Sequence, residues 1–421
     1  MKVRLAVVLV LAIVAGPAAV VGAQLPNASP AAMGLGGAYT AMAKGYDAVA
    51  WNPANLAMPG NPAFSLTLLA VNAAPGLDPI SYNTLAPYSG KTLPSSARTQ
   101  WLQSVQSASG ENLGSNLGVT EFAMSAGPFA LQIGTSVDAR ATLGPGLAQA
   151  LLFGNAGRTG SVETINFAGS GVHVGVATTA GLSYGRTIVK SGARHVSVGA
   201  TFKYTVGNFL AMAQDNGSVA DSSSVTVKFP MVYSNPDSSV FVGKGYGLDL
   251  GLSWTEGSVT YGMAVKNVLN TFAWDASHLT AKAGTAFFDG TTNTTDFNDA
   301  AYSTAPQSLR DRVANDSYKP VVSTGLAYAW KKNTTLSFDA MQMAAGGIST
   351  LPQTQVGGGI EFRGIPLLAL RAGGAYITGG WNAGGGLSLH LGPFQMGVGA
   401  ALTDRNGGQS PTVNLNVLSV R

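Results

Sequence analysis

The sequence predicts an all-β fold, an antiparallel transmembrane β-barrel with an N-terminal segment in its lumen. Charged residues make up only 10% of the chain, against about 25% in soluble globular proteins, while 55 residues are glycine. Runs of strict alternation also recur along the chain, with large apolar side chains on one face and small or polar ones on the other. Such runs are typical of strands that separate lipid from a lumen.

The clearest alternation covers residues 245–254 and resumes in residues 259–266 after a short turn, which predicts a hairpin. In the first run the second face is mostly glycine and serine, whereas a soluble sheet usually exposes lysine, glutamate and arginine there. The face that we expect to contact lipid carries Tyr246, Leu248, Leu250, Leu252 and Trp254.

The N-terminus predicts export. Lys2 and Arg4 precede an apolar run, and Val21-Gly22-Ala23 has the form of a signal-peptidase site, so we expect residues 1–23 to be a signal peptide. The absence of cysteine excludes a lipid-anchored lipoprotein, disulfides and thiolate metal sites. No later apolar run approaches the roughly 18 residues that a membrane-spanning helix needs. After cleavage, basic residues would exceed acidic ones by only two, which gives no reason to expect nucleic-acid binding.

Residues 24–59 differ from the rest, because they show neither strand alternation nor a helical stripe. They are rich in alanine, glycine, methionine and asparagine. Small residues permit close backbone packing, and Pro53 biases Asn52 away from helical geometry. We therefore expect short helical turns that fill the lumen as a hatch, with residues 60–421 forming the barrel.

The remaining alternation gives about 16 strand segments, with tight turns at 127–128, 255–258, 331–333, 364–366 and 392–393. Residues 72–117 are expected to be irregular with a short helix near 96–107, and residues 144–153 to form a short helix or loop cap. Outer-membrane barrels place short turns on the periplasmic side and long loops outside. The strands are expected at 63–71, 122–140 (a hairpin), 172–188, 196–206, 225–233, 245–254, 259–266, 279–288, 320–330, 334–343, 355–363, 367–377, 383–391, 394–402 and 412–420.

Five charged or titratable residues have the parity of the inward face: Lys203, Asp249, Lys266, Asp339 and His390. They could solvate the lumen, pin the hatch through ion pairs, or take part in selectivity. The acidic loop at 289–317 is either an ordinary solvated loop or a site for cations shared with lipopolysaccharide, and it lacks calcium-loop spacing. Neither a metal site nor a cofactor is predicted. Residues 181–185 match a nucleophile-elbow pattern but lie inside an alternating run, so no enzyme is predicted.

A motif in the N-terminal segment resembles the FadL-type superfamily of outer-membrane barrels. Its residues are Gly34, Gly36, Gly37, Asp47, Asn52, Pro53 and Ala54. Runs at 245–251, 266–271, 370–374 and 391–394 are similar to a neighbouring branch associated with type IX secretion and conjugation operons. The resemblance implies a barrel of 14 strands, fewer than the alternation alone gives, plugged by an N-terminal hatch.

The resemblance implies a channel in the bacterial outer membrane for passive uptake of small hydrophobic molecules such as fatty acids. Residues 151–153 would capture an amphiphile, the three glycines would let the hatch move, and Asn52 and Pro53 would anchor its end. The alternative is a non-transporting barrel that acts as a docking or assembly partner in a secretion or conjugation system. The expected partners are outer-membrane lipid and lipopolysaccharide, a hydrophobic ligand and, in the alternative, a secretion-system protein.

Overall fold

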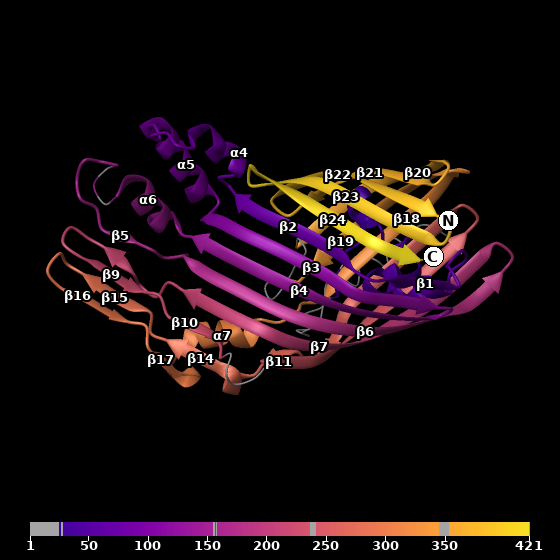
Figure 1. The fold of residues 1–421 in the computed structure, drawn as a ribbon, viewed down its shortest axis with the longest axis horizontal. Coiled ribbons are helices and arrows are strands. Elements are labelled where there is room, and N and C mark those ends of the chain that lie inside the picture. Colours follow the sequence, from indigo (N-terminus) through magenta and orange to yellow (C-terminus); the bar gives the residue numbers. More distant parts are fainter. Residues whose placement is uncertain are drawn as a thin grey trace, which may run out of the picture.

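The protein forms a closed antiparallel barrel, with further helices and strands beyond one of its ends (Figure 1). The computed structural model describes residues 25–26, 28–154, 156, 158–235, 241–344 and 353–420, so the predicted signal peptide lies outside the described residues. Within them, none of the helices is long and apolar enough to cross a membrane.

The barrel wall has 14 strand positions, as the resemblance implied, and we call each of these positions a stave. The first stave is made of two strands in line, and each later stave is one strand. In chain order the strands are β1 (Phe64–Thr67) with β2 (Ala70–Asp78), β3 (Glu111–Ala126), β4 (Phe129–Leu143), β6 (Gly171–Ser191), β7 (Arg194–Gln214), β11 (Gly243–Glu256), β12 (Val259–Asn270), β18 (Val321–Lys331), β19 (Thr334–Met343), β20 (Thr354–Ile365), β21 (Leu368–Ile377), β22 (Gly380–Leu391), β23 (Phe394–Arg405) and β24 (Gly408–Val420).

The first and last staves close the barrel. Asn72 of β2 lies opposite Gly118 of β3 on one side and opposite Asn414 of β24 on the other. The expected single strand at 63–71 is interrupted at Leu68 and Leu69, where Leu69 has a φ of 101°. The expectation of irregular chain from residue 72 was wrong, because β2 runs on to Asp78 and β3 already begins at Glu111.

The predicted faces of the clearest strand are confirmed. In β11, Tyr246 is 54% exposed on the outer face, whereas Asp249 and Ser253 on the inner face are 3% and 0% exposed. The hairpin to β12 is also confirmed, since Glu256 lies opposite Val259 across the turn. The alternation therefore distinguished the lipid side from the lumen side correctly.

Two of the 16 predicted strand segments are not staves. The run at 225–233 is divided into β9 (Val225–Lys228) and β10 (Met231–Ser234), and the run at 279–288 into β14 (Leu279–Lys282) and β15 (Thr285–Phe288). Pro230 breaks the first run because it lacks an N–H, and Gly284 breaks the second with a φ of +61°. The breaks lie side by side, since the Phe229 amide donates to the Gly284 carbonyl at 2.8 Å.

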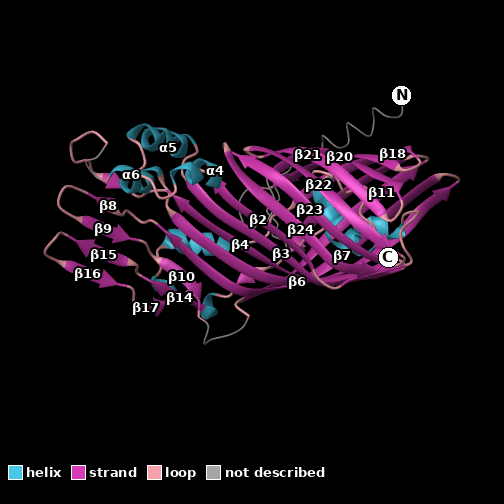
Figure 2. Cartoon of the chain, turned by 45° about the horizontal axis from the view of Figure 1, so that its top comes forward, coloured by secondary structure: helices cyan, strands magenta, loops and turns pink. Residues whose placement is uncertain are grey.

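These divided strands contribute to a large structure beyond the long-loop end of the barrel (Figure 2). It contains the helices α4 (Tyr82–Leu85), η4 (Ala86–Tyr88), α5 (Ser95–Ser107) and α6 (Pro145–Phe153). The helices α5 and α6 were predicted from the sequence. The polar region at 289–317 folds here, at the loop end. A separate five-stranded sheet has the order β16 (Asn293–Asp296), β15, β9, β8 (Val219–Ala220) and β5 (Ile165–Asn166). The elements β13 (Ala273–Trp274), η5 (Ala276–His278), β17 (Asp299–Ala301), η6 (Tyr302–Thr304) and α7 (Gln307–Asn315) complete it.

The N-terminal segment forms the short helical turns that its composition predicted, and they pack inside the barrel. They are α2 (Pro30–Gly34), η2 (Gly45–Asp47), α3 (Ala48–Trp51) and η3 (Pro53–Ala57). We call residues 25–59 the hatch segment. Its own small core is built from Ala31, Ala32, Leu35, Tyr39 and Ala43.

Glycines of the barrel wall let the hatch backbone come close. A Cβ on Gly373 would overlap the backbone of Leu35 and Gly36, and one on Gly199 would overlap the backbone of Pro53 and Ala54. Gly36 and Gly37 of the hatch have φ angles of 62° and 79°, which glycine adopts readily. The high glycine content therefore has a packing cause, since hatch and wall meet backbone to backbone.

We predict that Gly373→Ala destabilises the barrel by about 1–3 kcal/mol, because the added methyl group overpacks the hatch contact. The matched control is Gly385→Ala on the neighbouring strand, where the nearest atom to an added Cβ is 3.5 Å away. Urea unfolding of the refolded protein in detergent measures both. Equal stability of the two variants would contradict the close hatch contact.

Candidate functional site

Asp339 of β19 holds the middle of the hatch segment. Its Oδ2 accepts hydrogen bonds from the backbone amides of Tyr39 and Thr40, at 3.0 and 2.8 Å. Hydrogen bonds to a charged acceptor are stronger than those between neutral groups. The carboxylate therefore fixes the chain direction where the hatch crosses the lumen.

The Asn-Pro-Ala part of the motif fixes the second half of the hatch to β11. The Asn52 side-chain amide donates to the Leu252 carbonyl at 3.0 Å and to the Ser253 hydroxyl at 3.1 Å. The Ala54 amide in turn donates to Asn52 Oδ1 at 3.1 Å, and Pro53 begins η3. Asn52 and Ala54 are fully buried, so these bonds are shielded from water.

Asn55 and Asp47 connect parts of the hatch segment to one another. The Asn55 side chain donates to the carbonyls of Thr40 and Ala43, at 3.0 and 2.9 Å, and accepts from the Ser253 hydroxyl. Asp47 accepts a hydrogen bond from the Tyr39 hydroxyl at 3.1 Å. The segment is thereby a folded unit in its own right.

Three of the predicted inward charges lie together beside the hatch. Lys203 Nζ is 2.5 Å from Asp249 Oδ1 and donates to Asn267 Oδ1, also at 2.5 Å. The backbone amide of Asn267 donates to Asp249 Oδ1 at 2.7 Å, so each of the three residues contacts the other two. Lys266 lies over the Trp51 ring of the hatch, 5.3 Å from its centroid. The lysines and carboxylates thus pair with the wall or the hatch.

Of the remaining predicted residues, the three glycines contact the barrel wall, and His390 lies near a turn. Gly34, Gly36 and Gly37 meet the wall at Gly386, Gly374 and Gln355 respectively, as a motif for close packing should. His390 is half-buried near the turn end of β22, opposite Gln395 of β23.

The sequence did not predict two further contacts inside the barrel, one within the wall and one between wall and hatch. Arg371 Nε donates to Glu361 at 2.7 Å inside the barrel, and Gln355 donates to the Gly36 carbonyl at 2.9 Å. Glu361 and Arg371 share the parity of the wall glycines Gly359 and Gly373, so the alternation could have revealed both.

Two cavities adjoin each other on the loop side of the hatch. The mouth cavity, of about 420 Å³, lies toward the long loops, and the hatch cavity, of about 190 Å³, borders Trp51, Lys266 and Asp339. Both are lined by Ala74, Asn382, Thr403 and Thr412. A third, the turn-end cavity of about 440 Å³, lies at the opposite end of the barrel.

Residues 39–42 separate the cavities, and we call them the gate segment. Thr40 lines the hatch cavity, whereas Tyr39, Ala41 and Met42 line the turn-end cavity. Asp339 binds the amides of this same segment. The gate segment therefore lies between the hatch cavity and the turn-end cavity.

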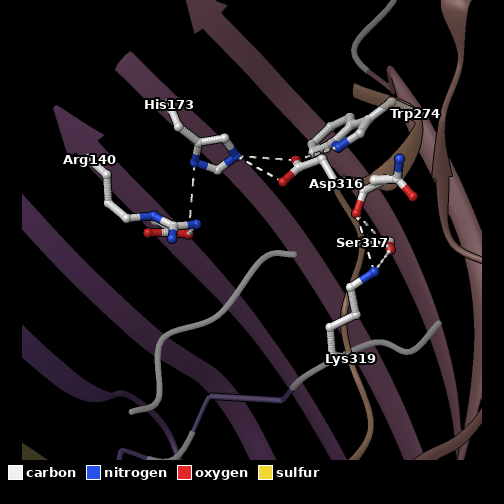
Figure 3. A network of polar contacts seen from close by, with 8 residues as sticks. Arg140, His173, Trp274, Asp316, Ser317 and Lys319 are labelled. Atoms are coloured by element: carbon white, nitrogen blue, oxygen red, sulfur yellow. Dashed lines mark hydrogen bonds and ion pairs between the residues drawn. The ribbon is translucent and has the colours of Figure 1, made fainter. Parts of the chain in front are cut away.

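A polar network at the loop end holds the chain after α7 in the barrel mouth (Figure 3). His173 Nε2 lies 3.1 Å from both Asp316 oxygens, and Trp274 Nε1 donates to Asp316 at 2.9 Å. Arg140 pairs with Asp138 at 2.6 Å on the other side of His173. Next to Asp316, burial raises the pKa of the Tyr318 phenol, so this fully buried ring stays neutral.

A fourth cavity follows this network. It has a volume of about 370 Å³ and shares Arg140 and Thr142 with the mouth cavity. His173 and Asp316 also line it. A series of cavities thus leads from the loop end to the hatch.

A model of a family of unknown function, DUF5723, matches residues 53–401. The chain belongs to this family. The match includes most of the barrel and begins within the hatch motif at Pro53. No curated protein matches this DUF5723 chain.

Solved outer-membrane channels have the same fold. The deltaS2S3 mutant of the TodX monoaromatic hydrocarbon channel matches with a TM-score of 0.53 and 11% identity over 95% of this chain and 98% of the other. The deltaS2 mutant gives 0.51 and 11% over 94% and 98%. The toluene transporter TodX of Pseudomonas putida gives 0.49 and 11% over 95% and 98%. At these identities the likeness concerns the fold, and it confirms the barrel fold that the resemblance implied.

We predict that Asp339→Ala frees the gate segment. Losing two hydrogen bonds to a carboxylate, each worth about 1.5–3 kcal/mol, should raise amide hydrogen exchange at Tyr39 and Thr40 at least tenfold. Mass spectrometry of deuterated peptides from this segment measures the effect. Asp404→Ala, at the loop end of β23, is the control, and unchanged exchange in Asp339→Ala would contradict the assigned role.

We predict that Asp249→Asn costs about 3–5 kcal/mol of stability, because it leaves the buried Lys203 ammonium without its counter-charge. Lys203 and Asp249 are 1% and 3% exposed. Replacing both partners, as Lys203→Met with Asp249→Leu, should cost less than the single change. Urea unfolding in detergent tests this order, and a double variant less stable than Asp249→Asn would contradict it.

Proposed function

We propose that this protein is a bacterial outer-membrane channel for passive uptake of small hydrophobic molecules such as fatty acids. The observation that carries the proposal is the series of cavities that lie on both sides of the gate segment. In this proposal residues 1–23 direct export, residues 24–59 act as the hatch and residues 60–421 form the barrel. The long loops face outward, toward lipopolysaccharide.

The loop-end helices would capture the molecule. Leu151 of α6 is 69% exposed and Tyr82 of α4 is 74% exposed, which offers apolar surface to a lipid tail. Leu152 and Phe153 instead pack against the buried cluster around Trp101. Of the three residues expected to capture an amphiphile, Leu151 is thus the one best placed to do so.

The lining of the mouth cavity favours a molecule with one polar end. Asn112, Asn116 and Arg140 alternate there with Leu113, Ala141 and Ile377. A fatty acid has both kinds of surface, whereas a pure hydrocarbon would leave the buried Asn116 Oδ1 without a hydrogen-bond partner. We therefore propose an amphiphile in preference to an aromatic hydrocarbon.

The gate segment would control the final step. Release of Tyr39 and Thr40 from Asp339 would open the hatch cavity into the turn-end cavity. Gly36 and Gly37 would absorb the change in backbone direction, while Asn52, Pro53 and Ala54 keep the end of the hatch on β11. The proposed role is transport without catalysis; Ser183 of the elbow-like sequence lies within strand β6 and shares a hydrogen bond with Thr201.

The comparisons support a channel at the level of fold, since the TodX proteins are described as monoaromatic hydrocarbon channels. The second candidate is a non-transporting barrel that docks a partner in a secretion or conjugation system. The close backbone contacts between the hatch and the wall favour it, because they oppose opening. Transport assays distinguish the two.

We predict opposite effects of two hatch variants on uptake of a fluorescent long-chain fatty acid into proteoliposomes. Gly36→Trp should abolish uptake, because its side chain has no room beside Gly374. Asp339→Ala should increase uptake severalfold, because it releases the gate segment. Asp404→Ala is the control variant, and we expect it to leave uptake unchanged. Equal background rates in all four proteins, wild type included, would favour the docking role.

A further inference from the structure

The turn-end cavity opens at the end of the barrel opposite the long loops. It lies between the hatch and the strands β12, β18, β19 and β20, and its walls include the gate-segment residues Tyr39, Ala41 and Met42. Its volume of about 440 Å³ is large enough for several side chains. Cationic side chains at its edge are Lys44, Lys332 and Arg363.

The cavity lies inside the barrel and away from lipid. Thr260 and Ala327, which line it, face each other across β12 and β18. They share the inward parity of Gly262, where an added Cβ would lie 2.9 Å from the Thr40 carbonyl of the hatch. An occupant must therefore enter from the aqueous side.

Positive charge is concentrated around this opening. Glu361, the acidic residue in the cavity lining, already pairs with Arg363 at 2.8 Å and with Arg371 at 2.7 Å. Lys332 is exposed and forms no ion pair among the described residues. Further cations on the neighbouring strand ends are Arg186, Lys190, Arg194 and Lys331, against the single carboxylate of Glu256.

The positive charge occupies one side of the barrel rim. These residues belong to consecutive staves from β6 to β20, and Figure 1 shows the β6 and β7 ends projecting at the right of the view. The turns at 127–128 and 392–393, on the other side, consist of glycine and proline. Phospholipid headgroups surround a barrel on all sides, so lipid anchoring does not explain the asymmetry.

We propose that this basic rim and the turn-end cavity bind an acidic segment of a periplasmic protein. Carboxylates of the segment would meet Lys331 and Lys332 on the rim, and one of its side chains would enter the cavity against Met42. Charge complementarity of this kind supports fast and specific association. The inference goes beyond uptake and requires only that the short turns face the periplasm.

Such a partner would touch the hatch directly. Tyr39, Ala41 and Met42 line the docking cavity, while Thr40 between them lines the hatch cavity on the other side. Binding from the periplasm would therefore affect the hydrogen bonds that the Tyr39 and Thr40 amides donate to Asp339.

The test uses the full mature barrel in phosphatidylcholine nanodiscs and a fluorescein-labelled peptide of alternating glutamate and glycine. Fluorescence anisotropy should show saturable binding that weakens with salt. Lys331→Glu with Lys332→Glu should weaken binding about tenfold or more. The matched control, Lys91→Glu with Lys228→Glu, reverses two exposed charges at the loop end and should bind as the wild type does.

A second variant separates docking in the cavity from general attraction. Ala329→Trp keeps every charge but fills the cavity that Ala329 lines, and it should also weaken binding. Equal binding by the two charge-reversed doubles, or full binding by Ala329→Trp, would overturn the proposal. Displacement of the peptide by phosphatidylglycerol vesicles would overturn it in favour of a lipid surface.

Discussion

The structure depends on the close approach of the hatch backbone to the barrel wall. A 14-stranded barrel has a lumen too wide for wall side chains to fill, and here a folded N-terminal segment fills it. Leu35 lies against Gly359 and Gly373, and Pro53 lies against Gly199. Any side chain on these glycines would push the hatch away and lose its hydrogen bonds as well. The packing of the hatch segment inside the barrel therefore requires glycine at these wall positions.

Within that tight contact, few polar bonds define where the hatch can move. Asn52 and Asn55 are buried and bond to β11 and to the hatch itself, so they hold the later half firmly. The gate segment is held by the half-buried Asp339 through two backbone amides and by Asn55 through the Thr40 carbonyl. Residues 39–42 have cavities on both sides, and for this reason we propose that the hatch opens there.

The alternation of side chains predicted the staves well, because lipid and lumen select opposite residue types at every second position. It failed where alternation occurs outside the 14 strands of the barrel wall, as in the runs broken by Pro230 and Gly284. Inward parity identified Lys203, Asp249, Lys266 and Asp339. It could not show that Asp339 binds Tyr39 and Thr40, since these residues lie about 300 positions apart in the sequence. Such pairings depend on barrel closure and hatch docking, which no local pattern encodes.

The central claim is that the gate segment moves when a ligand occupies the lumen. The chain has no cysteine, so spin labels can be attached at Met42→Cys and Ala329→Cys, on two walls of the turn-end cavity. Double electron–electron resonance would compare their distance distribution before and after addition of a fatty acid. The account predicts a second, longer distance with ligand. An unchanged single distance at saturating ligand would contradict a moving gate.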